Sequence, residues 1–175
     1  MKTMFAVFLL SLALNFSYAE MAEMKTVDSV DLNRYLGKWY EIAKYPNWFE
    51  KNLTAVTAAY SLRDDGKIKV LNAGRKGSPD GKEKTALGKA WVADKKTNAK
   101  LKVQFFWPFS GNYWIIELGS NYEYAVVGEP KRKYLWILGR TPEMNEKLYN
   151  ELLKRIEKHG YDLNKIEKTF YSRVN

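Results

Sequence analysis

Gly37-Lys38-Trp39-Tyr40-Glu41-Ile42-Ala43 is the stretch that decides the fold. Pro46-Asn47 stops the segment that contains it, so we predict a β-strand over residues 37–45. Short segments of the same kind follow along the chain, and turn residues separate them. This arrangement is typical of an antiparallel barrel or sandwich.

Seven more strands are predicted after the first one. Asp64-Asp65-Gly66 predicts a tight hairpin, because Asp-Gly supplies the positive φ of a primed turn, whereas residues 74–81 and 108–111 read as loops. Eight strands in hairpin order can close on themselves and enclose one small ligand. The predicted strands cover residues 54–63, 67–73, 85–93, 99–107, 112–118, 122–128 and 133–140.

One helix is predicted after the last strand, over about residues 142–159. Thr141 is its expected N-cap and Pro142 its first residue, while Gly160 ends it. Apolar side chains recur every four residues along it, so one stripe should pack on the outside of the barrel. The tail at 168–173 can add a short strand.

The N-terminal residues predict export. Met1-Lys2 precede an apolar run that ends in small residues at Ser17 and Ala19, so residues 1–19 read as a signal peptide, with a buried helix as the alternative. Residues 20–175 then form a single domain. Because the chain has no Cys, it cannot carry the acylated Cys of a bacterial lipoprotein, and we expect it free in the periplasm or secreted.

Composition narrows the partners. The net charge is +9, but Lys and Arg are spread along the chain, which favours a solvated barrel surface over contact with anionic lipid and, last, over nucleic acid. Aromatic residues make up 15% of the chain, with 6 Trp and 12 Tyr, which suits a cavity lined with rings.

Three motifs resemble those of the lipocalin family, in its bacterial lipocalin and apolipoprotein D branch. They are Gly37-Lys38-Trp39 at the first strand, Ser120-Asn121-Tyr122 before the seventh, where the family often has Thr-Asp-Tyr, and Arg140 after the eighth. The resemblance implies an eight-stranded antiparallel up-and-down β-barrel with one C-terminal α-helix packed on its outside. It also implies that Trp39 closes one end of the barrel beneath the guanidinium of Arg140, with Gly37, Asn121 and Tyr122 as structural residues.

If Trp39 faces inward, strand alternation assigns the lining of a ligand cavity. Trp136 is the strongest candidate for ligand contact, and the small side chains of Ala58 and Ala90 should leave room. A packed core without ligand is the alternative. The predicted lining comprises Ala58, Tyr60, Ile68, Val70, Asn72, Ala90, Leu101, Val103, Phe105, Tyr113, Ile115, Val127, Tyr134, Trp136 and Leu138.

Two further features bear on this cavity. Glu41 shares the parity of Trp39, so its carboxylate points inward, where it is either paired within the protein or available to a ligand. The loops at the open end carry several Trp and Phe residues, which either form an apolar lip for lipid contact or seal the mouth.

Catalytic chemistry has little support. With no Cys and the single His159, which we expect to be a surface residue at the helix end, the usual Ser-His-acid, Cys-His and His-cluster metal sites lack parts. We therefore expect no catalytic residue, metal or cofactor. Asn52-Leu53-Thr54 matches a glycosylation sequon, which matters only in a eukaryotic secretory pathway.

The leading hypothesis is an exported carrier of a small hydrophobic ligand such as a fatty acid or lysophospholipid. An enzyme that uses tyrosine or carboxylate chemistry inside the barrel is the second hypothesis, and a module that binds membrane or protein through its mouth or outer face is the third. Whether the chain is a monomer or a homodimer stays open.

Overall fold

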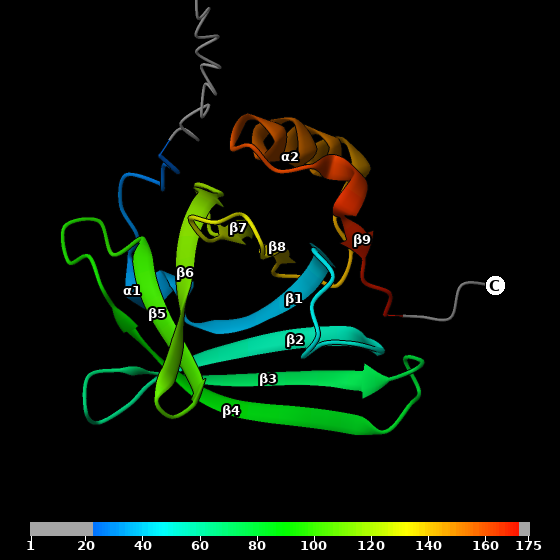
Figure 1. Ribbon diagram of the computed structural model, residues 1–175, viewed down its shortest axis with the longest axis horizontal. Coiled ribbons are helices and arrows are strands. Elements are labelled where there is room, and N and C mark those ends of the chain that lie inside the picture. Colours follow the sequence, from blue (N-terminus) through cyan, green and yellow to red (C-terminus); the bar gives the residue numbers. More distant parts are fainter. Residues whose placement is uncertain (1–22, 172–175) are drawn as a thin grey trace, which may run out of the picture.

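The computed structural model describes residues 23–171. Within them the chain forms eight antiparallel strands that follow one another around a barrel (Figure 1). The strands are β1 (Gly37–Lys44), β2 (Leu53–Leu62), β3 (Ile68–Lys76), β4 (Glu83–Val92), β5 (Lys100–Phe106), β6 (Phe109–Leu118), β7 (Tyr124–Gly128) and β8 (Leu135–Gly139). The predicted signal peptide, residues 1–19, lies outside the described part of the chain.

The barrel closes through β1. This strand pairs with β2 along one edge and with β8 along the other, so every strand has two partners. The remaining pairings join neighbours in sequence, which makes the topology up-and-down. The predicted fold is therefore confirmed.

The C-terminal helix α2 (Glu146–Lys158) lies across the outside of the barrel, near β7 and β8 (Figure 1). Leu152 and Ile156 are fully buried beneath it, in a cluster that includes Val126 and Ile137 from the barrel wall. The apolar stripe thus has the predicted role. After α2, a 3-10 turn at Leu163–Lys165 leads to β9 (Glu167–Lys168), which pairs with β1. The end of the predicted tail strand, residues 172–173, lies outside the described part of the chain.

The predicted start of the helix is wrong. Asn145 is the N-cap, and its side-chain oxygen accepts hydrogen bonds from the amides of Lys147 and Leu148 at 3.0 and 3.3 Å. The hydroxyl of Thr141 instead donates to the carbonyl of Glu143 in the preceding loop. Thr and Asn can both serve as an N-cap, so residue type alone does not decide which of them begins the helix.

Two predicted loops are also shorter than expected. β3 continues through Gly74 to Lys76, so only the end of the predicted 74–81 loop is irregular. β6 already begins at Phe109, which pairs with Phe106 across a tight turn at Trp107-Pro108. Both hairpins extend the strands toward the same end of the barrel.

Two short elements were not predicted, the 3-10 turn at Leu163–Lys165 and the helix α1 (Leu32–Tyr35) before β1. Asp31 caps α1 by accepting a hydrogen bond from the amide of Asn33 at 2.9 Å.

In the described residues no helix is long and apolar enough to cross a membrane.

Candidate functional site

Trp39 and Arg140 close one end of the barrel. The indole of Trp39 is fully buried, and the guanidinium carbon of Arg140 lies 3.7 Å from the centre of its ring. The predicted cation–π contact is therefore present. Gly37 has a φ of +94°, and a β-carbon there would lie 3.4 Å from Nη1 of Arg140.

Arg140 also holds α1 against this end. Its guanidinium donates hydrogen bonds to five backbone carbonyls at 2.7–3.3 Å, and all but one of them belong to the chain around α1. The fifth is the carbonyl of Tyr122, at 3.1 Å. The five acceptors are the carbonyls of Arg34, Tyr35, Leu36, Lys38 and Tyr122.

The second motif completes the closed end. The hydroxyl of Tyr122 accepts a hydrogen bond from the amide of Asp31 at 2.7 Å, and the guanidinium of Arg34 lies over its ring. Asn121 is exposed, and its amide donates to the carboxylate of Glu123 within the turn. Tyr122 thus ties the turn before β7 to the cap of α1.

The predicted lining residues lie inside the barrel, with differing exposure. Fourteen of the predicted lining residues lie within strands. Asn72 faces the interior like the others, because it pairs with Ala58. The fully enclosed members of the interior cluster are Tyr60, Ile68, Val70, Ala90, Leu101, Ile115, Val127 and Leu138. Those packed against it but only half-buried are Ala58, Val103, Phe105, Tyr113 and Trp136.

Tyr134 differs from the rest because it precedes β8. Its ring stacks on that of Trp136 with 5.9 Å between centroids, and Phe49 from the β1–β2 loop lies 5.8 Å from it. Tyr134 therefore belongs to an aromatic group at the open end rather than to the wall.

A cluster of tyrosines fills the deep part of the interior. The hydroxyl of Tyr113 is hydrogen-bonded to those of Tyr35 and Tyr60 at 2.7 and 2.9 Å. Burial raises the pKa of Tyr60 to about 12, so the hydroxyls stay protonated at neutral pH. The sequence analysis missed Tyr35 because α1 carries too few residues to show a helical period.

These tyrosines share a narrow apolar pocket with Ala90 and with Ile68, Leu101 and Val103. The pocket measures about 250 Å³ when space open to solvent is included, and its free room holds about one water molecule. Ala90 and Tyr35 both line this pocket, so the room beside Ala90 at the deep end is small. The more exposed lining residues lie elsewhere in the interior.

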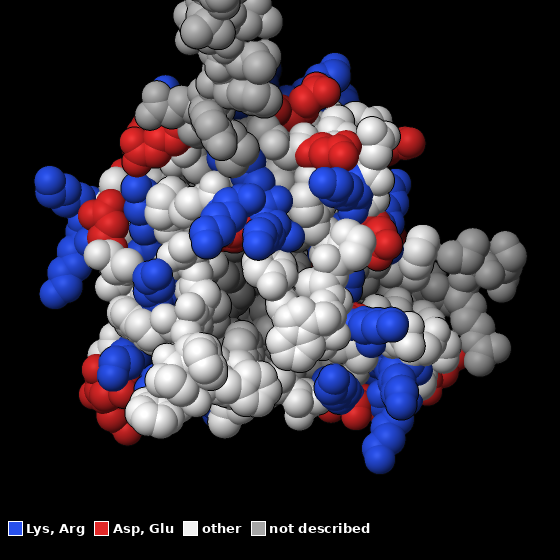
Figure 2. Space-filling view, viewed as in Figure 1, with Lys and Arg blue, Asp and Glu red and all other residues white. Residues whose placement is uncertain are grey.

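The surface around the open end is hollowed. Figure 2 shows the hollow at the centre of the face, with Lys and Arg side chains along one side of its rim. Large aromatic side chains in the β1–β2 loop and at the tip of the β5–β6 hairpin are exposed: Trp48 by 75%, Phe106 by 71%, Trp107 by 85% and Phe109 by 78%. Among the loop rings Phe49 is the one that turns toward Trp136, at 6.3 Å.

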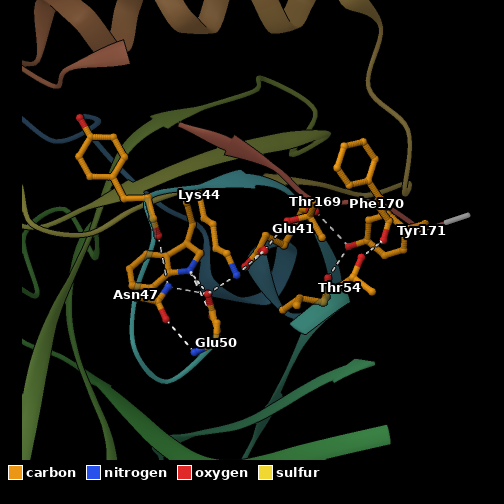
Figure 3. A network of polar contacts seen from close by, with 11 residues as sticks. Glu41, Lys44, Asn47, Glu50, Thr54, Thr169, Phe170 and Tyr171 are labelled. Carbon is orange, nitrogen blue, oxygen red and sulfur yellow. Dashed lines mark hydrogen bonds and ion pairs between the residues drawn. The ribbon is translucent and has the colours of Figure 1, made fainter. Parts of the chain in front are cut away.

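A buried ionic network lies between the interior and the mouth (Figure 3). Nζ of Lys44 is 3.5 Å from a carboxylate oxygen of Glu41 and 3.3 Å from one of Glu50. Each of the three residues is less than a tenth exposed. Glu41 is thus paired within the protein, which is the first of the two alternatives for it.

Burial raises the pKa of the Glu41 carboxyl to about 8, and the negative charge of Glu50 adds to this effect. Lys44 and a hydrogen bond from Thr169 act in the opposite direction. At neutral pH the Glu41 carboxyl is therefore largely protonated. Among the side chains of residues 23–171, three buried polar atoms have no hydrogen-bond partner: Oε2 of Glu41, Nζ of Lys44 and Oδ1 of Asn72.

The sequence analysis missed Lys44 and Glu50. A β-bulge between Glu41 and Ala43 shifts the register with β8, so Glu41 pairs with Leu138 and Lys44 with Trp136. Both partners face the interior, and both charged residues therefore do so too. Strict alternation would have placed Lys44 outside.

His159 lies at the end of α2, as predicted, and its ring nitrogen is 3.0 Å from the carboxylate of Glu117. Among residues 23–171 no group of His, Cys, Asp or Glu is arranged to hold a metal ion.

Comparison with known proteins gives one consistent family. The model of the lipocalin-like domain matches residues 30–170. The chain is 41% identical to the outer membrane lipoprotein Blc of Vibrio cholerae, over 92% of this chain and 95% of that one. It is 40% identical to temperature-induced lipocalin-1 of Arabidopsis thaliana, over 86% and 84%, and 34% identical to mouse apolipoprotein D, over 97% and 92%.

Solved structures agree on the fold. Insecticyanin from the tobacco hornworm Manduca sexta superposes with a TM-score of 0.68 at 24% identity, covering 86% of each chain. Lobster apocrustacyanin A1 gives a TM-score of 0.63 at 19% identity, covering 82% of this chain and 79% of its own.

Proposed function

The chain belongs to the lipocalin family, and from this membership we propose that it binds and carries a fatty acid or lysophospholipid inside its barrel. The family typically binds small hydrophobic ligands. The proposal for this chain is carried by the half-buried apolar lining of the interior, and the hollow in one face of the molecule is consistent with it (Figure 2).

The ligand lies in the upper interior. Tyr35, Tyr60 and Tyr113 leave almost no room in the deep end, whereas Phe105 and Trp136 keep part of their surface accessible. An acyl chain would gain about 0.8 kcal/mol for each CH₂ that it removes from water there. The other predicted lining residues frame this space and position these side chains.

The chain offers a matched pair of variants to test this site. Ala58 faces the interior, while its neighbour Ala59 faces outward, where it pairs with the exposed Leu71. We expect Ala58→Phe to reduce the binding of a fluorescent fatty acid at least tenfold, and Ala59→Phe to leave it unchanged. Equal binding by both variants would exclude the barrel interior as the site.

Native mass spectrometry of the protein purified from its natural compartment identifies the carried molecule. The expected result is an added mass that corresponds to a fatty acid or lysophospholipid. Protein that carries nothing and takes up no amphiphile when mixed with one would refute the carrier function.

Export is part of the proposal. Residues 1–19 have the features of a signal peptide, and a relative of the chain is named an outer membrane lipoprotein. We place the mature chain in the periplasm or outside the cell, without an acylated Cys. Mass spectrometry of the N-terminus of the natural protein tests this, and a chain that retains Met1 would contradict it.

Contact with anionic membrane is a second candidate, favoured by the exposed rings at the mouth. Trp107 and Phe109 form the tip of the β5–β6 hairpin, and Lys and Arg side chains lie along the rim of the hollow (Figure 2). We expect the protein to float with anionic vesicles at low salt and less so at high salt, because salt screens the Lys and Arg charges. Trp107→Ser should weaken flotation, whereas flotation that does not change would exclude the hairpin as the contact.

A further inference from the structure

Glu50 lies in a carboxylate-binding site formed by the protein itself. It belongs to the β1–β2 loop, yet its side chain is only 9% exposed. Three nitrogen atoms surround the carboxylate: Nδ2 of Asn47 at 2.6 Å, Nζ of Lys44 at 3.3 Å and Nε1 of Trp136 at 3.3–3.4 Å (Figure 3). Each can donate a hydrogen bond to an anion.

Two of these donors belong to the barrel wall, and the third belongs to the same loop as the carboxylate. Lys44 and Trp136 are register partners on β1 and β8, so the barrel wall holds them side by side. Asn47 lies in the same loop as Glu50 and accepts a hydrogen bond from its amide at 2.9 Å. Lys44 and Trp136 on the barrel wall can thus donate hydrogen bonds to an anion, and the carboxylate of Glu50 from the loop is the anion that lies beside them.

The surroundings suit an amphiphile. Trp136 belongs to the interior lining, and its ring is flanked by those of Tyr134 and Phe49. The ammonium of Lys44 is buried without a well-oriented hydrogen bond to either carboxylate. An anion at this point would have apolar surface for its chain and an unsatisfied donor for its oxygen atoms.

We propose that Glu50 occupies the site of an anionic lipid head group, and that the head group of the ligand displaces it from Lys44 and Trp136. The proposal rests on the carrier function and specifies which ligands the barrel prefers. Displacement is required because Glu50 already occupies Lys44 and Trp136, and a second carboxylate beside the same ammonium would be repelled by the first. The β1–β2 loop moves outward with Glu50.

Binding of chain-matched amphiphiles by calorimetry tests the proposal. Palmitate carries a carboxylate, lysophosphatidate a phosphate, and 1-hexadecanol no charge. We expect Glu50→Gln to bind palmitate about tenfold more tightly than the wild type does, and to bind 1-hexadecanol within about twofold of the wild-type affinity. Lys44→Met should lower the affinity for palmitate about tenfold and leave the affinity for 1-hexadecanol unchanged.

Two further variants complete the set, one that tests the second donor and one that serves as the control. Trp136→Phe keeps an aromatic ring but removes the donor, so it should weaken palmitate without altering the charge of the site. Glu83→Gln removes an exposed carboxylate that pairs with Arg75, and we expect no effect on either ligand. Lysophosphatidate affected in the same way as palmitate supports a general anion site, and palmitate affected alone supports a carboxylate site.

Movement of the loop has its own readout. Lys51 is exposed in the β1–β2 loop, so trypsin should cut there faster when palmitate is bound but not when 1-hexadecanol is bound. If 1-hexadecanol binds and palmitate affinity does not respond to Glu50→Gln or Lys44→Met, the head-group site is refuted while the carrier function stands. If neither amphiphile binds, the carrier function fails and the head-group site with it.

Discussion

Replacing Arg140 with Ala should destabilise the closed end of the barrel by about 4 kcal/mol. The guanidinium lies 3.7 Å from the ring centre of Trp39, a contact that contributes about 1 kcal/mol. Of its five carbonyl acceptors, those of Arg34 and Lys38 are at exposed positions, where water can replace the lost donor.

The other three acceptors are partly buried, and each would lose about 1–1.5 kcal/mol when its charged donor is removed. The contacts share one side chain and are not independent, so we place the total slightly below their sum. For a domain of this size, 4 kcal/mol lowers Tm by roughly 8–16 °C. Arg140→Lys keeps the positive charge but loses the planar guanidinium with its several N–H donors, and it should lower the free energy of unfolding by about 2 kcal/mol.

Urea unfolding followed by circular dichroism measures these values. The matched control is Arg75→Ala, because Arg75 pairs with Glu83 at 3.2 Å while both side chains are more than 40% exposed, and such pairs contribute little. Amide exchange should also quicken across α1 in the Arg140 variant. A loss of stability below about 1 kcal/mol, no greater than in the control, would refute this account of the closed end.

Three further predictions concern the rest of the fold. Because the pKa of Glu41 is about 8 in the folded chain, the folded chain keeps a proton that the unfolded chain releases. The free energy of unfolding should therefore fall as pH rises from about 4.5 to 8, by at most about 1.4 kcal/mol per pH unit. Glu41→Gln should flatten this fall in urea titrations at pH 5.5 and 8, and an unchanged slope would contradict the assignment. Asn145→Ala should cost about 1 kcal/mol by calorimetric unfolding, whereas Thr141→Ala should cost less, and the reverse order would show that the helix begins earlier. Gly37→Ala should cost about 1–2 kcal/mol in the same assay, since its φ of +94° is unfavourable for any residue with a β-carbon, and a neutral result would mean that the backbone there can relax.

Strand alternation was predictable because it is a covalent property of the chain. Successive β-carbons point to opposite faces of a strand, so one inward residue assigns the others on that strand. Leu101, Val103 and Phe105 lie inside the barrel for this reason. The tight turn after Leu62 and the apolar stripe of α2 are equally local, and both were found from residue type and spacing.

The amino-acid sequence by itself thus determined the number of barrel strands and most of their faces, since these follow from short-range patterns. The contact of Trp39 with Arg140 was implied by the resemblance of the motifs to the lipocalin family. Only the tertiary structure decided what occupies the interior. Tyr35 reaches Tyr113 across 78 residues of sequence, and Glu50 reaches Trp136 across 86. Such contacts depend on how distant segments pack, and the bulge that turns Lys44 inward depends on the register with β8, which no window of neighbouring residues contains.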